Sequence, residues 1–301
     1  MAVTVKRAEL GAFLRSRRER ITPSDVGLLD GTRRRTPGLR REEVAQLSGV
    51  GVTWYTWLEQ GRPIHASVQV LDAIARTLRL NPSERTHLFR LAEVPGTEAA
   101  PPPCSDCPLP AEVMAVLEAI SPYPASVVTE MFDLLAWNEP YAALFPNLVT
   151  ASPEERNTLY VHLTRPACCH PVDNREQQII AMVSQLRASY GRHVGDPVWT
   201  SFINRMEAAS EEFAAAWQSH DVAHNVHYLK VFRHPAVGRI TVTTASFDVR
   251  EVPGARMVVY TAKDQASQEA LHRLAVGQIE DAHFPCWPAH DPKRALASAP
   301  I

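Results

Sequence analysis

The 301-residue sequence predicts an α+β protein, in which an all-α N-terminal domain precedes a domain built on a five-stranded antiparallel sheet with a helical insertion. Two observations predict this class. Apolar residues recur at helical spacing in the first third of the chain, and alternating strand patterns appear near its end. Between them lies a Pro-rich stretch that cannot continue a helix. We therefore expect domains at residues 1–98 and 112–280, a linker at 99–111 and a C-terminal tail at 281–301.

Charge is divided unevenly between the two ends of the chain. Residues 1–95 hold 16 lysines and arginines against 10 acidic residues, whereas residues 96–301 hold 15 against 23. A basic domain joined to an acidic one is typical of proteins that bind nucleic acid and have a second function. No apolar run approaches the roughly 18 residues needed to span a bilayer, and the first twenty residues lack the apolar core of a secretory signal. We expect a cytoplasmic protein with no membrane partner.

The N-terminal domain is predicted to contain five helices. Leu10, Phe13 and Leu14 share one face of a helix over residues 8–20. A polar loop follows to residue 38, and two short helices meet near residue 49. The last two helices are predicted over 67–78 and after the capping sequence of residues 81–84, Asn-Pro-Ser-Glu.

The stretch from residue 40 to residue 62 is the most informative in the sequence. Two short helices that meet at a tight turn need a small residue where they touch and a glycine where the chain reverses. Ala45 and Gly49 meet these needs. The remaining face of the second helix is rich in side chains that can contact base edges in the major groove. These candidate DNA-contacting residues are Val52, Thr53, Trp54, Thr56, Trp57 and Gln60.

Arginines flank this motif and are candidates for phosphate contacts. Arg40, Arg41 and Arg62 lie where such contacts would position the second helix on DNA. The run of Arg33, Arg34 and Arg35 either reaches the DNA backbone or minor groove, or forms a solvated loop. A helical hairpin that only packs explains the alanine and the glycine of the turn, but it does not explain these arginines or the two tryptophans.

The C-terminal domain shows the order of elements that is typical of a PAS-like fold. Two strands are predicted over 126–131 and 132–137, and a helical region opens with a capping box at residues 152–155 and continues to residue 217. Three further strands are predicted over 225–233, 238–249 and 256–262, before a last helix over 267–276.

Both domains resemble one family. Ala45, Gly49, Val50, Leu58, Glu59 and Gly61 have the spacing of the Cro-type (XRE family) helix-turn-helix. More narrowly, GLRREEVA at 38–45 and YTWLEQGR at 55–62 resemble the MmyB-like transcriptional regulators. The segments LAWN at 135–138, RHPAVG at 233–238 and VYTA at 259–262 are similar to the ligand-binding domain of that family. The resemblance covers residues 8–276 and implies a ligand-responsive transcription regulator whose PAS-like domain can hold a fatty acid.

A lipid-like ligand needs an apolar wall and a partner for its carboxylate. Burying about ten methylenes would gain roughly 8 kcal/mol before ordering costs, whereas an unpaired buried charge is unfavourable. For the wall we expect Phe132, Leu134, Trp137, Trp217 and Phe247, although these side chains could instead form only the core. The candidate carboxylate partners are Arg156, Arg165, His170 and Tyr228.

Five cysteines leave a second class of regulator open. Cys104 and Cys107 have the spacing of a metal-binding pair, and Cys168, Cys169 and His170 could complete a zinc site. A metal- or thiol-sensing regulator is therefore one alternative, and a constitutive DNA-binding module without ligand is another.

The remaining expectations concern catalysis and assembly. No nucleotide-binding, metalloprotease or serine-hydrolase motif is present, so we expect no enzyme, no metal site and no obligatory cofactor. Because one helix-turn-helix contacts only a half-site, we expect a homodimer on a double-stranded DNA operator.

Overall fold

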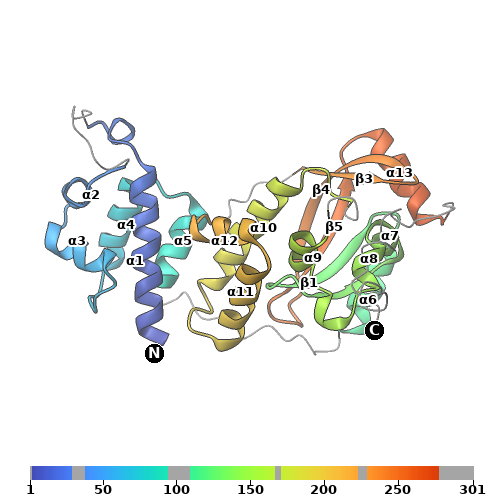
Figure 1. Ribbon diagram of the computed structural model, residues 1–301, viewed down its shortest axis with the longest axis horizontal. Coiled ribbons are helices and arrows are strands. Elements are labelled where there is room, and N and C mark those ends of the chain that lie inside the picture. Colours follow the sequence, from blue (N-terminus) through green and yellow to red (C-terminus); the bar gives the residue numbers. More distant parts are fainter. Residues whose placement is uncertain (1, 29–37, 94–108, 167–170, 223–228, 278–301) are drawn as a thin grey trace, which may run out of the picture. The chain divides into compact units, whose positions relative to one another are not determined.

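The computed structural model describes residues 2–28, 38–93, 109–166, 171–222 and 229–277 (Figure 1). Its helices and its single five-stranded antiparallel sheet confirm the predicted α+β class. The chain divides into two compact units, each of which gathers segments that are distant in the sequence. The first unit contains Met1–Ala99, Val183–Glu207 and Ala214–Val226, and the second contains Ala100–Met182, Ala208–Phe213 and His227–Ile301.

The five helices predicted for the N-terminal region are all present. Asn81 begins the last of them because its side chain accepts a hydrogen bond from the Glu84 N–H at 2.9 Å, and Pro82 follows at the first helical position. A 3₁₀ turn, Ser24–Val26, follows the first helix. The helices are α1 (Ala2–Arg20), α2 (Arg41–Ser48), α3 (Val52–Glu59), α4 (Val68–Thr77) and α5 (Pro82–Leu91).

Helix α1 is central to the packing of the N-terminal helices. It contacts α3 and α5, and α4 packs against α2 and α5. Phe13 and Leu14 of α1 are fully buried, as are Tyr55 of α3 and Leu71 of α4. Leu47 of α2, three residues after fully buried Val44, has 41% of its surface exposed.

The first unit also contains helical segments from the C-terminal half of the chain. They come from α10 (Arg175–Tyr190), α11 (Pro197–Ala209) and α12 (Glu211–Gln218). Arg187 is fully buried there, where its guanidinium pairs with Glu9 of α1 and lies 3.8 Å from the centre of the Trp217 ring. Arg17 of α1 donates to Glu84 at 2.8 Å and to Asp221 at 3.0 Å. Two ion pairs, with their arginines buried, therefore join segments 178 and 204 residues apart in the sequence.

The second unit contains the sheet, whose strands follow the order β2-β1-β5-β4-β3 and pair antiparallel throughout. Val127 in the central part of β1 is fully buried, as are Ile240 and Val242 of β4. The strands are β1 (Ala125–Thr129), β2 (Leu134–Trp137), β3 (Lys230–His234), β4 (Gly238–Asp248) and β5 (Ala255–Ala262).

Each face of the sheet has its own apolar core. On one face, Leu117 of α6 (Ala111–Ala119) packs with Val127, Met257 and Val259. Tyr141, Leu163 and Leu271 are buried in helices that follow the strands. The larger core, on the other face, combines side chains from four of these helices with side chains from all five strands. The helices of this part of the chain are α7 (Glu139–Leu144), α8 (Pro146–Val149), α9 (Thr158–Thr164) and α13 (Gln265–Ala275).

Two local expectations are corrected by hydrogen bonding near β2. The capping sequence at residues 152–155 forms only a 3₁₀ turn, and α9 begins instead after Asn157, whose side chain accepts from the Tyr160 N–H at 2.9 Å. The chain cannot be helical between them because the Arg156 carbonyl accepts a bond from the Leu134 N–H at 2.9 Å. Phe132 has a φ of +68° and therefore lies in the turn between β1 and β2 rather than in a strand.

Candidate functional site

Helices α2 and α3 form a helix-turn-helix. Gly49 ends α2 with a φ of +69°, a left-handed conformation that glycine adopts without steric cost. The Val50 N–H then closes the turn by donating to the Ala45 carbonyl at 2.9 Å, and Ala45 itself is fully buried between the helices. The two residues that predicted this motif therefore have the expected structural roles.

Helix α3 has one buried and one exposed face. Tyr55 and Leu58 point into the core, with exposed fractions of 0% and 3%. The opposite face exposes Val52 by 48% and Trp57 by 39%. Thr53 and Gln60 are also exposed, and Trp54 and Thr56 are partly buried. All six side chains predicted to contact DNA therefore reach the surface of one helix, which can enter a major groove.

The end of α3 is held against α1 by a close backbone approach. A Cβ atom on Gly11 of α1 would lie only 2.4 Å from the Glu59 carbonyl oxygen, so only glycine fits there. Gly61 has a φ of +68°, and a Cβ atom there would lie 2.8 Å from the Arg7 carbonyl oxygen. These close backbone contacts hold the C-terminal end of α3 against α1.

A buried carboxylate completes the anchoring of α3. The side chain of Glu59 is fully buried and accepts hydrogen bonds from Arg18 at 2.8 and 2.9 Å. The Arg41 Nε donates to the same carboxylate at 2.9 Å. Burial would raise the pKa of Glu59, but the bonds from Arg18 and the charges of both arginines outweigh burial and lower it. Glu59 thus links α1, α2 and α3 through charge.

The arginines expected to contact phosphate have different environments. Arg40 precedes α2 with 48% of its side chain exposed, and its backbone N–H donates to the Glu43 carboxylate at 2.7 Å. Arg41 keeps 41% exposure while pairing with Glu59, and the Arg62 guanidinium lies 5.6 Å from the centre of the Trp57 ring. Arg33, Arg34 and Arg35 lie outside the described residues.

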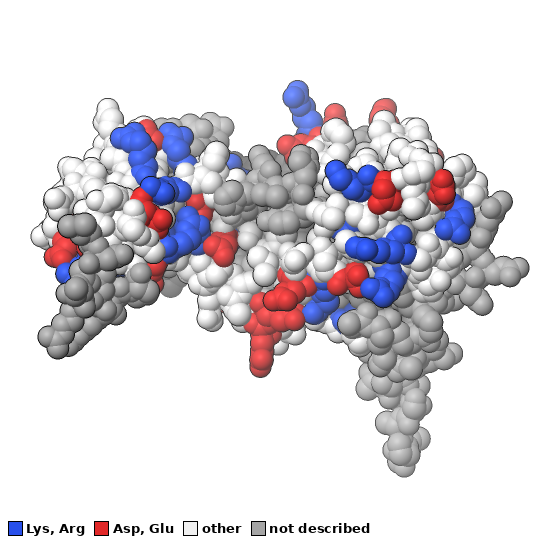
Figure 2. All heavy atoms as spheres, turned by 90° about the horizontal axis from the view of Figure 1, so that it is seen from above, with Lys and Arg blue, Asp and Glu red and all other residues white. Residues whose placement is uncertain are grey.

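Basic side chains do not form a uniform surface on the face seen in Figure 2. Lysines and arginines are visible on the part formed by the N-terminal helices, but acidic side chains lie among them. On this face, therefore, basic and acidic side chains are interspersed.

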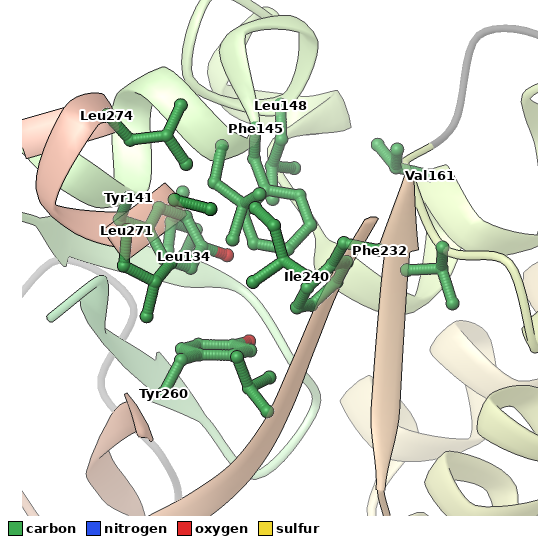
Figure 3. Close-up of a cluster of buried hydrophobic side chains, with 14 of the residues drawn as sticks. Leu134, Tyr141, Phe145, Leu148, Val161, Phe232, Ile240, Tyr260, Leu271 and Leu274 are labelled. Atoms are coloured by element: carbon green, nitrogen blue, oxygen red, sulfur yellow. The ribbon is translucent and has the colours of Figure 1, made fainter. Parts of the chain in front are cut away.

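The second candidate site is the face of the sheet that carries the larger apolar core (Figure 3). Four aromatic side chains meet there, and we call them the aromatic quartet: Tyr141, Phe145, Phe232 and Tyr260. Ring centres are 4.7 Å apart for Tyr141 and Phe145, and 5.5 Å apart for Phe145 and Phe232. The Tyr260 ring lies 5.9–6.0 Å from the other three. The quartet packs with aliphatic side chains that include Leu134, Leu144, Leu148, Val161, Ile240, Leu271 and Leu274.

Several hydroxyl groups lie inside this apolar core. The hydroxyls of Tyr141 and Thr158 are buried and make no hydrogen bond within the described residues. The hydroxyls of Ser126, Thr158 and Tyr260 lie near that of Tyr141 without reaching hydrogen-bonding geometry. Burial raises the pKa of Tyr141 to about 12, so its phenol stays protonated and able to donate. The core therefore offers unused donors.

Two basic side chains that the sequence reasoning missed lie on this same sheet face. Residues 256, 258 and 260 of β5 alternate onto one face, and Lys230 reaches that face through the register of β3 with β4 and of β4 with β5. The Lys230 ammonium lies 5.2 Å from the centre of the Tyr260 ring, and the Arg256 guanidinium 5.1 Å from that of Phe132. In each strand, a cation occupies a position that shares a face with apolar residues two positions away. This alternation is the sequence signal that could have identified both cations.

The residues expected to form the apolar wall are only partly brought together. Leu134 belongs to the larger core, and Trp137 packs against it. Phe132 is buried beneath Arg256. Trp217 belongs instead to the first unit, where it packs edge-on against the Tyr190 ring. Phe247 is 58% exposed and pairs with Met257, whose side chain belongs to the other face of the sheet.

Of the four expected carboxylate partners, the structure describes two, and each has a polar contact, although the buried Nε of Arg156 makes no hydrogen bond. Arg156 donates to the Ala151 carbonyl at 3.0 Å and lies 5.2 Å from the Trp137 ring centre. Arg165 lies 3.7 Å from Glu155. His170 and Tyr228 are outside the described residues.

Metal and membrane sites find no support in the part of the chain that the structure describes. Among the described residues, no three His, Cys, Asp or Glu side chains are grouped so as to hold a metal ion. All five cysteines lie outside those residues, so the thiol- or metal-sensing alternative stays a prediction. Likewise, none of the described helices combines the length and the apolar character needed to cross a bilayer.

Comparisons with known families match both candidate sites. A family model for a helix-turn-helix domain matches residues 9–88, which include α2 and α3. A model for the ligand-binding domain of MmyB-like transcription regulators matches residues 109–274, which include the whole sheet. None of the curated proteins compared matches the chain.

Proposed function

Because the chain belongs to the MmyB-like transcription regulators, we propose that it binds a specific DNA operator through α3 and that a small apolar molecule controls this binding. The observation that carries the proposal is the exposed face of α3. Val52, Thr53 and Trp57 are exposed on an anchored helix, although Val52 and Trp57 leave 48% and 39% of their apolar side chains unburied. Such a face can contact base edges and thymine methyl groups in a major groove.

The apolar ligand is proposed from the chemistry of the sheet face. The aromatic quartet is buried in an apolar core, an environment that suits an alkyl chain, and the buried hydroxyls of Tyr141 and Thr158 can donate to a polar end. A fatty-acid-like molecule combines both parts. We also propose a homodimer, because two copies of α3 would contact the two half-sites of an operator.

The chain segments that make up the first unit support coupling between ligand binding and DNA binding. Val183–Glu207 and Ala214–Val226, which lie inside the ligand-binding family match, share that unit with α1 and α3. The buried pair of Arg187 with Glu9 joins these segments to α1, which contacts α3. A ligand that favours one arrangement of these helices would therefore change the affinity for DNA.

Thr53→Ala tests the role of α3. The operator would first be selected from a random-sequence DNA library with the purified full-length chain. We expect Thr53→Ala to weaken operator binding by about 1–3 kcal/mol and to leave binding to random DNA nearly unchanged, because the lost contact is to a base. Fluorescence anisotropy at fixed salt measures both affinities.

A matched control is available on another helix. Thr86 of α5 is also an exposed helical threonine, and Thr86→Ala is expected to leave both affinities unchanged. Equal losses on operator and random DNA for Thr53→Ala would instead assign Thr53 to phosphate contact or folding.

A further inference from the structure

The imidazole of His220 lies between the two charges of a buried ion pair. Its Nδ1 is 3.0 Å from the Nη1 of Arg187 and 3.4 Å from a carboxylate oxygen of Glu9. The same Glu9 oxygen pairs with Arg187, whose side chain is only 1% exposed. One ring nitrogen therefore faces a donor and an acceptor that also bind each other.

The protonation state of the ring decides which of these neighbours it can bind. A guanidinium only donates, so the Nδ1 of neutral His220 accepts the hydrogen bond from Arg187. A proton added to that nitrogen removes the acceptor and places a second cation beside Arg187. The protonated Nδ1 can then donate to Glu9, so that two cations share one carboxylate. Protonation of His220 therefore weakens the pair of Glu9 with Arg187.

Arg187 depends strongly on this pair. Within the described residues its buried Nε makes no hydrogen bond, and its Nη2 donates to the Trp217 carbonyl. Burial lowers the pKa of Arg187, and the negative charge of Glu9 opposes that shift. A buried charge with incomplete hydrogen bonding is sensitive to any competitor for its carboxylate.

The position of His220 is determined by the residues on either side of it. Its φ of +56° is a left-handed conformation, which is uncommon for residues other than glycine. The carbonyl of Ser219 and the carboxylate of Asp221 both accept hydrogen bonds from Arg17 of α1, at 2.9 and 3.0 Å. The His220 side chain keeps 20% exposure, so protons from solvent can reach the ring.

Other titratable and charged groups also face this cluster. Histidine is the side chain that ordinarily changes its charge between pH 5 and 8. His87 does not take part, because burial lowers its pKa to about 3, and burial raises the pKa of Tyr190. This leaves His220 as the responsive group of the cluster. The surrounding groups are Arg17 of α1, Glu84, His87 and Arg90 of α5, Tyr190 of α10, and Asp221.

Helix α1 connects the ion pair to the helix that is proposed to contact DNA. Glu9 and Arg17 are eight residues apart and share one face of α1, which binds the segment around His220. Gly11 and Arg18 of the same helix contact Glu59 at the end of α3. A change at Glu9 therefore acts on the helix that positions α3.

We propose that His220 is a proton-sensitive control of operator binding, in which the neutral ring supports the pair of Glu9 with Arg187 and the protonated ring weakens it. The proposal rests on the proposed function, because the regulated activity is operator binding by α3. Acid releases α1 from the segment around His220 and lowers the affinity for the operator. This sign is distinctive, since added positive charge alone would strengthen binding to any DNA.

The test measures the affinity of the full-length chain for its selected operator and for random DNA at pH 8 and pH 5.5. We expect the operator Kd to rise at least about fivefold at pH 5.5, as fluorescence anisotropy at fixed salt measures. His220→Asn removes the titrating ring, and asparagine tolerates the left-handed conformation at this position. His220→Asn is expected to bind the operator with nearly the same affinity at both pH values.

Two further variants test the ion pair and the specificity of the effect. Glu9→Gln removes the carboxylate for which the two cations compete, and it is expected to weaken operator binding at pH 8 at least about fivefold, with no further loss at pH 5.5. His272→Asn on α13 is the matched control, because His272 is an exposed helical histidine. It is expected to keep the full pH dependence.

General acid destabilisation is separated from the switch by the same variants. His220→Asn retains His87 and His193, so its fold should lose stability in acid as the unsubstituted chain does. Far-UV circular dichroism at both pH values shows that each chain is folded. A pH effect that disappears only in His220→Asn and Glu9→Gln therefore belongs to the cluster.

Each of the other outcomes contradicts the switch. An operator affinity that is independent of pH, or full pH dependence in His220→Asn, would overturn it while leaving operator binding in place. Loss of the pH dependence in His272→Asn would assign the effect to overall charge and would also overturn it, as would equal weakening on random DNA. If no operator can be selected, the switch fails together with the proposed function.

Discussion

Glu59→Gln is expected to lower the free energy of unfolding of the first unit by about 3–5 kcal/mol, because it breaks a buried ion pair and leaves half-exposed Glu19 as the charged partner of Arg18. The Glu59 side chain is fully buried, and only 6% of the Arg18 side chain is exposed. Glutamine keeps the size of the side chain but cannot balance the guanidinium groups of Arg15, Arg18 and Arg41, which all lie within 4 Å of the Glu59 carboxylate. Denaturant unfolding, combined with hydrogen exchange of the α3 amides, measures the loss.

Glu59→Gln should also weaken DNA binding, because Glu59 holds α3 in position and does not itself contact DNA. Glu59 joins Arg18 of α1 and Arg41 of α2 at the end of α3, so its loss frees the helix that carries Thr53 and Trp57. The control is Glu42→Gln, since Glu42 is an exposed acid of α2 with 62% side-chain exposure, and we expect an effect within about 0.5 kcal/mol. A stability equal to that of the unsubstituted chain would contradict the anchoring role of Glu59.

Acid should destabilise the first unit at a pH where its carboxylates are still charged. His87 has 1% exposure, and burial lowers its pKa to about 3 from an ordinary value of 6.5. His87 is therefore neutral in the folded state, whereas the unfolded chain takes up a proton below pH 6.5. Stability is fully present above pH 6.5 and falls as the pH is lowered, by up to about 1.4 kcal/mol per pH unit for each such histidine.

His87→Leu is expected to remove about 2 kcal/mol from the loss of stability between pH 7 and pH 5. His193 adds to the loss in the unsubstituted chain, because burial lowers its pKa to about 4. The pKa values of Glu9, Glu59 and Glu84 are lowered, so their contribution is lost only below pH 4.5 and lies outside this window.

Urea unfolding at pH 7, 6 and 5 measures the slope. Exposed His65 provides the control, and His65→Leu is expected to keep the slope of the unsubstituted chain. An unchanged slope in His87→Leu would show that His87 does not titrate as its burial requires.

The helix-turn-helix could be predicted from the sequence because its signals are local. Ala45 and Gly49 are four residues apart, and each is required by contacts within one turn of chain. The positions of β4 and β5 along the chain could be predicted for a similar reason, since alternation within a strand depends on neighbouring residues. Residue type and spacing suffice where one turn or one strand determines the geometry.

Contacts between distant segments could not be predicted in this way. Arg187 and Glu9 are 178 residues apart, and nothing near either residue indicates the other. Trp217 was expected on the sheet face because it is a large aromatic residue, but its helix packs in the first unit beside Arg187. Lys230 and Arg256 were missed because their shared face depends on strand register across β3, β4 and β5.

Ligand control of operator binding is tested most directly by the affinity of the full-length chain for its selected operator, measured with and without saturating dodecanoate. Bound lipid would be removed first, and fluorescence anisotropy would be measured at fixed salt on operator and on random DNA. A ligand-responsive regulator predicts tight binding to the operator alone and a change in Kd of at least about fivefold when dodecanoate is added. An operator affinity that dodecanoate does not change would contradict control by this ligand. Failure to select any DNA sequence would contradict the role of α3.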